Sequence, residues 1–204
     1  MLSFAVLIAL QSKVLNYDIV RNGKLIGDAK VLIKITADGG KRTDSKLSLS
    51  QNDKKLDMHT TQVWALSGRP TLKIVQIFDA KGVETSRTRV DFRVTDVLVT
   101  YTKNNKLTKS TVVIPPKAEI RDLPEFWFLR DEPEIGKPFK YWVFNATDAV
   151  WEEATSTYVG PDKSRKLRNI SQQIAKRKLA ISLDADGFPV ETISNDGIKI
   201  VVKL

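Results

Sequence analysis

Residues 22–35 read N-G-K-L-I-G-D-A-K-V-L-I-K-I, and this stretch decides the fold class. Apolar or small residues occupy every second position, and mostly charged residues fill the positions between them. The first set is Leu25, Gly27, Ala29, Val31, Ile33 and Ile35, and the second includes Lys24, Asp28, Lys30 and Lys34. A two-residue period of this length predicts a β-strand with one buried face and one wet face. Asn22-Gly23 suits the positive φ angles of a tight hairpin, so another strand should precede it.

The same alternation recurs along the chain between turn residues. It marks strands near residues 15–19, 47–49, 56–65, 72–78, 90–94, 97–101, 107–114, 139–144, 150–159, 174–183, 188–193 and 198–202, and residues 160–169 read as a basic loop. About a dozen short strands joined by tight turns predict an antiparallel meander. Its apolar face must be covered, so we expect an all-β, curved sheet or an open or partly closed β-barrel. We assign residues 13–204 to a single antiparallel β domain; residues 115–121 are the weak candidate for a boundary between two halves.

One internal segment departs from this pattern. Residues 122–131 read D-L-P-E-F-W-F-L-R-D, with Asp122 placed to cap a helix and Pro124 and Glu125 in its first turn. Bulky apolar residues follow at helical spacing. We therefore expect one short helix, which would plug or cover an opening of the curled sheet.

The first twelve residues are treated apart from the domain. Residues 1–10 read M-L-S-F-A-V-L-I-A-L, which is too short for a helix across a bilayer but suits the apolar core of a secretory signal. No basic residue precedes the run, so a buried first strand or an N-terminal helix is the alternative. We favour a signal segment at residues 1–12, and no other stretch is a candidate for a transmembrane span.

The net charge is basic, which favours anionic binding partners. The 204 residues carry a formal net charge of +9, and there is no cysteine, which excludes disulfides and thiolate sites. A basic cluster contains Lys163, Arg165, Lys166, Arg168, Lys176, Arg177 and Lys178. It could bind an anionic lipid or cell-wall polymer, but no aromatic residue stands within it, so we expect no nucleic acid. A solvated surface is the simpler explanation of the cluster.

Residues suited to catalysis or metal binding are sparse. His59 is the only histidine, and no nucleophile motif accompanies it, so we interpret it as an ordinary strand residue. Asp184-Ala185-Asp186-Gly187 resembles the start of a calcium loop, but the position of the bidentate glutamate holds Asn195. Glu152 and Glu153 are adjacent on a strand and therefore point to opposite faces. We expect no catalytic residue, metal site or cofactor.

Aromatic residues gather in the middle of the chain. They include Phe126, Trp127, Phe128, Tyr141, Trp142, Phe144 and Trp151. If the sheet curls, some of them would line its concave side and bind a lipid or another hydrophobic small molecule. A packed core is the alternative.

Three segments together resemble the exported bacterial family known as domain of unknown function 3108. They are residues 15–27, L-N-Y-D-I-V-R-N-G-K-L-I-G; residues 126–139, with F-W-F-L-R before I-G-K-P-F; and the closing L-D-A-D-G-F-P-V at residues 183–190. Gly136-Lys137-Pro138 stands where that family more often has Pro-Gly. The resemblance implies a curved antiparallel sheet in the periplasm, similar to lipoprotein carriers. It implies no activity and no functional residues.

Three functional hypotheses follow from these patterns. The first is a non-enzymatic periplasmic protein that binds a hydrophobic ligand or an envelope protein on its curved sheet. The second is a scaffold whose basic face binds anionic lipid or cell-wall polymer. The third is an unrecognised hydrolase, which the sparse set of catalytic residue types makes the weakest of the three.

Overall fold

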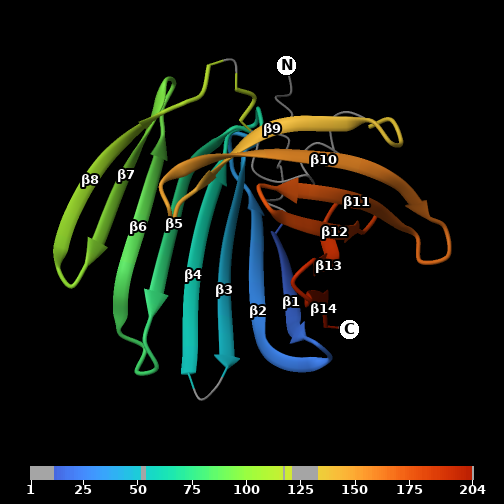
Figure 1. Ribbon diagram of the computed structural model, residues 1–204, viewed down its shortest axis with the longest axis horizontal. Helices are drawn as coiled ribbons and strands as arrows, with labels where there is room; N and C mark the ends of the chain where they lie inside the picture. The colour runs from blue at the N-terminus through green and yellow to red at the C-terminus, as the bar shows by residue number, and fades with distance from the viewer. Residues whose placement is uncertain (1–11, 52–53, 117, 121–132, 204) are drawn as a thin grey trace, which may run out of the picture.

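The computed structural model describes residues 12–51, 54–116, 118–120 and 133–203, and its strands form one sheet (Figure 1). The first eight strands are β1 (Ser12–Arg21), β2 (Lys24–Ile35), β3 (Lys41–Gln51), β4 (Lys54–Trp64), β5 (Pro70–Phe78), β6 (Glu84–Phe92), β7 (Asp96–Lys103) and β8 (Lys106–Val113). The other six are β9 (Pro138–Asn145), β10 (Val150–Asp162), β11 (Leu167–Ile174), β12 (Arg177–Leu183), β13 (Pro189–Ser194) and β14 (Ile198–Val202). The helix predicted at 122–131 and residues 1–11 of the predicted signal segment lie outside the described residues.

The order of the strands is that of a meander joined at its ends. Every strand pairs antiparallel with its sequence neighbour, except that β8 and β9 do not pair. β1 also pairs antiparallel with β14, so β8 and β9 become the two edges of the sheet. This confirms the predicted all-β class and the curved antiparallel meander, and the sheet does not close into a complete barrel.

Two hairpins in the last third correct the sequence-based prediction. Residues 160–169 are not a loop, because β10 continues to Asp162 and β11 begins at Leu167. The single strand predicted at 174–183 is the end of β11, a two-residue turn and β12. Lys166 and Ala175 adopt the positive φ angles of these turns, at 55° and 50°. Turns with positive φ usually carry glycine or asparagine, and these lack both, so the sequence did not indicate them.

A smaller correction concerns the strand predicted to run through Val94. β6 ends at Phe92, and the Val94 side chain is 84% exposed in the turn that follows. The hairpin predicted at Asn22-Gly23 is confirmed, with φ angles of 50° and 79°. Asparagine and glycine tolerate this conformation, which fixes the register between β1 and β2.

Hairpin β9–β10 bends over the concave face of the sheet. Figure 1 shows it running across β3, β4 and β5 near the ends at which β4 finishes and β5 starts. Near its tip, Phe144 and Ala146 are buried against Val90, Val97 and Val99 of β6 and β7. The two ends of the open sheet are therefore joined by side-chain packing and not by strand pairing.

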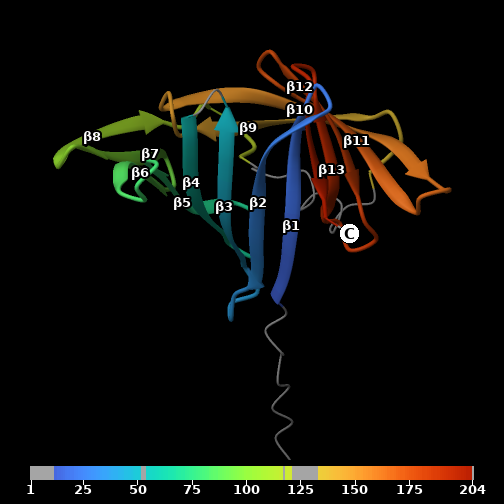
Figure 2. The same ribbon diagram turned by 90° about the horizontal axis from the view of Figure 1, so that it is seen from below.

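A second cluster of buried side chains lies where β1 joins the rest of the sheet. Leu15, Tyr17 and Ile33 form its centre, and Phe188 and Ile200 pack against it. Tyr17 is 5% exposed, and its hydroxyl donates a hydrogen bond of 2.8 Å to the carbonyl oxygen of Pro189. This contact fixes the chain after β12 against the first strand. Figure 2 shows β1 between the β2–β8 and β11–β13 parts of the sheet.

Gly27 is required by a close approach of two strands. A Cβ atom at this position would overlap the carbonyl oxygen of Ser48 on β3 and lie 3.0 Å from Leu49 Cα. Both neighbours are main-chain atoms, which cannot rotate away as a side chain could. The small residue in the alternating pattern of β2 therefore has a steric reason.

We expect Gly27→Ala to lower the free energy of unfolding by about 1–3 kcal/mol, because overpacking must separate β2 from β3. Urea denaturation followed by tryptophan fluorescence measures the change. Ser110→Ala on the exposed edge strand β8 is the control, with an expected effect within about 0.5 kcal/mol. Equal stabilities of the two variants would contradict the steric role of Gly27.

Candidate functional site

The candidate site is a cavity of about 740 Å³ between the sheet and hairpin β9–β10. Strands β3, β4 and β5 form one wall, and the tip of the hairpin with the adjoining end of β11 and β12 forms the other. The lining residues are Ser45, Met58, Thr60, Gln62, Lys73, Val75, Val143, Phe144, Asn145, Ala146, Thr147, Asp148, Glu152, Ile174 and Arg177. Apolar and polar side chains both face the space, so it differs from a packed core.

The sheet wall is built by register. Ser45, Thr60 and Val75 stand directly opposite one another on β3, β4 and β5, and Gln62 stands opposite Lys73. Directly opposed residues share a face of a sheet, so all five project to the concave side. Only Val75 among them is apolar, although this side holds the core elsewhere in the sheet.

A hydrogen-bonded network organises the hairpin wall. The side-chain amide of Asn145 donates to Asp148 Oδ2 at 2.9 Å and to Glu152 Oε1 at 3.0 Å. The second oxygen of Glu152 accepts from the Arg177 guanidinium at 3.1 Å. Glu152 is only 17% exposed, so its charge is balanced where the hairpin meets β12. This network holds three charged side chains in place at the cavity rim.

Sequence reasoning missed most of this lining. The signal was present in β3 and β4, where the concave-facing positions 43, 45, 60 and 62 hold Thr, Ser, Thr and Gln. A strand that buries one face normally places apolar residues there. Polar residues on both faces of two adjacent central strands indicate a wet interior.

The aromatic residues predicted to bind a ligand are dispersed by the structure. Phe126, Trp127 and Phe128 lie outside the described residues. Phe144 lines the cavity, and its ring packs edge-on against Trp151 with centroids 5.0 Å apart. Both rings belong to the cluster that joins the ends of the sheet, so packing accounts for most of their surface.

Tyr141 and Trp142 point to opposite faces of β9. Tyr141 is 3% exposed, and its hydroxyl contacts Ser156 Oγ at 3.0 Å and accepts a hydrogen bond from Gln172. This buried polar trio fixes the register of three strands. The main-chain N–H of Trp142 donates to the carbonyl oxygen of Glu119 at 2.8 Å. The segment that contains Glu119 therefore covers part of the β9 edge. Neither residue lines the cavity.

The predicted basic cluster separates into two groups. Lys163, Arg165 and Lys166 lie in the turn between β10 and β11, and Lys176 lies in the turn at the other end of β11. Eight residues of extended chain, about 26 Å, separate these two turns. Arg168 is placed near the first turn and Arg177 and Lys178 near the second, and Arg177 is the member that lines the cavity.

Arg165 is neutralised by a carboxylate of another strand. Glu191 accepts from Lys199 at 2.6 Å and pairs with Arg165 at 3.2 Å. The Lys199 hydrogen bond is the main cause that lowers the pKa of Glu191 below its ordinary value; partial burial opposes it, and Arg165 adds to the lowering. Arg165 is therefore part of an internal ion-pair group.

We expect Glu191→Gln to lower the free energy of unfolding by about 1 kcal/mol at pH 7. A lowered pKa in the folded state means that the ionised group stabilises the protein above about pH 4.3, its unfolded value. That contribution is lost as the pH falls through the lowered pKa, so the difference between variant and wild type should be smaller at pH 3 than at pH 7. Urea denaturation at both pH values measures this, with the exposed Glu153→Gln as control. A difference independent of pH would contradict the assignment.

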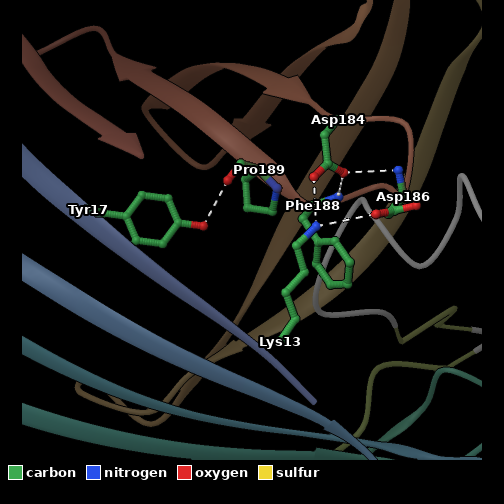
Figure 3. Close-up of polar contacts among 6 residues, drawn as sticks. All are labelled: Lys13, Tyr17, Asp184, Asp186, Phe188 and Pro189. Atoms are coloured by element: carbon green, nitrogen blue, oxygen red, sulfur yellow. Dashed lines mark hydrogen bonds and ion pairs between the residues drawn. The ribbon is translucent and has the colours of Figure 1, made fainter. Parts of the chain in front are cut away.

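The Asp184-Ala185-Asp186-Gly187 segment is a hairpin turn, as Figure 3 shows. Asp184 Oδ1 accepts from the main-chain nitrogens of Asp186 at 3.0 Å and Phe188 at 2.8 Å. The Lys13 ammonium lies 2.9 Å from Asp184 Oδ2 and 3.4 Å from Asp186 Oδ2, and 4.0 Å from the centre of the Phe188 ring. A lysine of β1 thus takes the place that a bound cation would need.

His59 lies on the convex face, opposite Lys46 and Gln76, with its ring 4.4 Å from that of Phe78. It is therefore separated by the sheet from the cavity that Thr60 lines. In the residues that the structure describes, no group of three or more His, Asp or Glu is placed to hold a metal. Within the same residues, no helix has the length and hydropathy needed to cross a bilayer.

A solved structure shares the fold of this chain at low sequence identity. No family model matches the sequence, and neither does any curated protein. The resemblance to the domain of unknown function 3108 family is therefore not confirmed. A crystal structure described as a β-barrel-like protein of domain of unknown function DUF1849 from Brucella abortus is similar, with a TM-score of 0.66 and 12% identity. The match covers 96% of this chain and 95% of that one, so the two share a β-barrel-like fold over nearly their whole lengths.

Proposed function

We propose that this protein is a non-enzymatic binding protein of the bacterial cell envelope, with its ligand held in the concave cavity. The cavity itself carries the proposal. Its volume of about 740 Å³ lies within the range of about 300–1,000 Å³ typical of small-molecule sites. A lining that combines Met58, Val75 and Phe144 with polar groups suits a ligand with an apolar portion and a polar one.

The chemistry of the lining supports binding over catalysis. Ser45 and Thr60 supply hydroxyl groups, but the sole histidine of the chain, His59, is on the opposite face of the sheet. A serine or threonine nucleophile needs an adjacent base; Ser45 Oγ instead donates to the carbonyl oxygen of Thr60, and among the described residues neither hydroxyl is hydrogen-bonded to a side-chain base. The envelope location rests on the apolar segment at residues 1–10.

We expect Thr60→Phe to reduce binding of the neutral fluorescent probe N-phenyl-1-naphthylamine about tenfold, because the larger ring fills the space beside Val75. Fluorescence titration measures the affinity, and thermal unfolding reports whether the variant is folded. His59→Phe places the same ring at the next position on the other face, and it should bind the probe as wild type does. Loss of binding in both variants, or in neither, would contradict the cavity as the binding site.

A second candidate function uses the convex face. Lys30 stands directly opposite Lys46, and Lys46 directly opposite His59. Both lysines are exposed, and among the described residues neither has a carboxylate within 4.0 Å. Like charges in opposed positions repel each other, and an anionic surface would relieve that repulsion. This row favours the binding of anionic lipid by the β2–β4 face.

We expect the double variant Lys30→Gln, Lys46→Gln to bind phosphatidylglycerol vesicles about tenfold more weakly than wild type, at about 1 kcal/mol or somewhat less per lysine. Co-sedimentation at low salt measures this binding, which should weaken further as salt is added. The double variant Lys163→Gln, Lys166→Gln removes the same charge from the β10–β11 turn and is the control. Equal binding of the vesicles by the two double variants would contradict the assignment of lipid binding to the convex face.

A further inference from the structure

We infer that the cavity takes an amphiphile with a single acidic head group, and that Lys73 binds this group. The inference rests on the proposed ligand-binding function and specifies the ligand class and its orientation. Three observations support it: the placement of Lys73, the partners of the other charged groups, and the change of polarity along the sheet wall.

Lys73 is a half-buried cation on the concave face of β5. It stands opposite Gln62 on one side and opposite Val90 on the other. Val90 is fully buried in the cluster where the hairpin packs on β6 and β7. Lys73 therefore lies at the end of the cavity that hairpin β9–β10 covers, which we call the covered end. Among the described residues, no carboxylate lies within 4.0 Å of its ammonium.

The other charged groups of the lining already have partners. Arg177 pairs with Glu152, and Asn145 links Glu152 to Asp148. These groups form one network on the hairpin wall, across the cavity from the sheet. A charge that loses solvent is stabilised by a partner of opposite charge, and of the two cations in the described lining Arg177 has such a partner and Lys73 does not. An acidic ligand group would supply it.

Polarity changes in one direction along the sheet wall. From Gln62 and Lys73, which lie beside the buried Trp64 and Val90, the concave positions become apolar toward the β3–β4 turn. The apolar concave residues are Leu47 and Leu49 on β3, Leu56 and Met58 on β4, and Ile77 on β5, matched to one another by register. Leu56 is 40% exposed, so this strip is open to a ligand.

The length of this path defines the ligand. Gln62 and Leu56 are six residues apart on one strand, which spans about 20 Å. A head group at Lys73 would direct an acyl or alkyl chain of similar length along the strip toward the β3–β4 turn. The head group is a carboxylate or a phosphate monoester, since either carries the charge that an ammonium recognises.

The test compares three probes of equal chain length: dodecanoate, dodecyl phosphate and dodecanol. Each displaces N-phenyl-1-naphthylamine from wild type, Lys73→Met, Lys73→Arg and the control Lys109→Met, which changes an exposed lysine of the edge strand β8. In wild type we expect at least one acidic probe to bind about tenfold more tightly than dodecanol. Lys73→Met should lose that preference and keep its affinity for dodecanol, while Lys73→Arg and Lys109→Met keep the preference. Thermal unfolding checks that each variant is folded.

The outcomes separate the two levels of the proposal. If dodecanol and the acidic probes bind wild type equally, or if Lys73→Met retains the preference, the head-group inference is wrong and the cavity proposal stands. If no probe displaces N-phenyl-1-naphthylamine, or the naphthylamine does not bind, the proposed function itself falls. A preference for dodecanoate over dodecyl phosphate, or the reverse, identifies the acidic group.

Discussion

The packing of the β9–β10 tip on β6 and β7 is the contact on which the rest of the structure depends. A sheet with one apolar face must cover that face, and here the described part of the chain has no helical layer with which to do so. The sheet bends until its own hairpin lies across its concave side, and Phe144 reaches Val90 and Val99. Without this contact the cavity would lose one wall, because β8 and β9 are not paired.

The charged residues divide into those that stabilise the fold and those that remain for a partner. Lys13, Arg165 and Arg177 each bridge segments far apart in the sequence. Other arginines pair within their own strand: Arg42 donates twice to Asp44 and lowers the pKa of that carboxyl. Lys73 inside the cavity and Lys30 and Lys46 on the convex face are among the described cations that have no carboxylate within 4.0 Å. The net charge of +9 therefore does not by itself indicate where an anionic partner would bind, because some of the cations are paired within the fold.

Local periodicity predicted the fold class because an alternating strand expresses its two environments in its own sequence. Asn22-Gly23 and the alternation of β2 are of this kind. The hairpins at Lys166 and Ala175 were missed because these turns adopt positive φ angles without the glycine or asparagine that usually marks them. The cavity was harder to foresee, since it depends on which strands face the β9–β10 hairpin across the bend. The ligand site was predicted at aromatic residues of β9 and β10, whereas the residues that indicate the cavity are polar ones on β3 to β5.

The pairing of β1 with β14 has a consequence for folding kinetics. Strands β1 to β8 and strands β9 to β14 each assemble through hairpins between sequence neighbours, which close with little loss of chain entropy. In the described residues, the strand pairing that unites these halves is the short ladder between Tyr17–Arg21 and Ile198–Val202. Bringing opposite ends of the polypeptide together is the entropically expensive step. We therefore expect the pairing of β1 with β14 to limit the rate at which the two meanders combine into one cooperative unit.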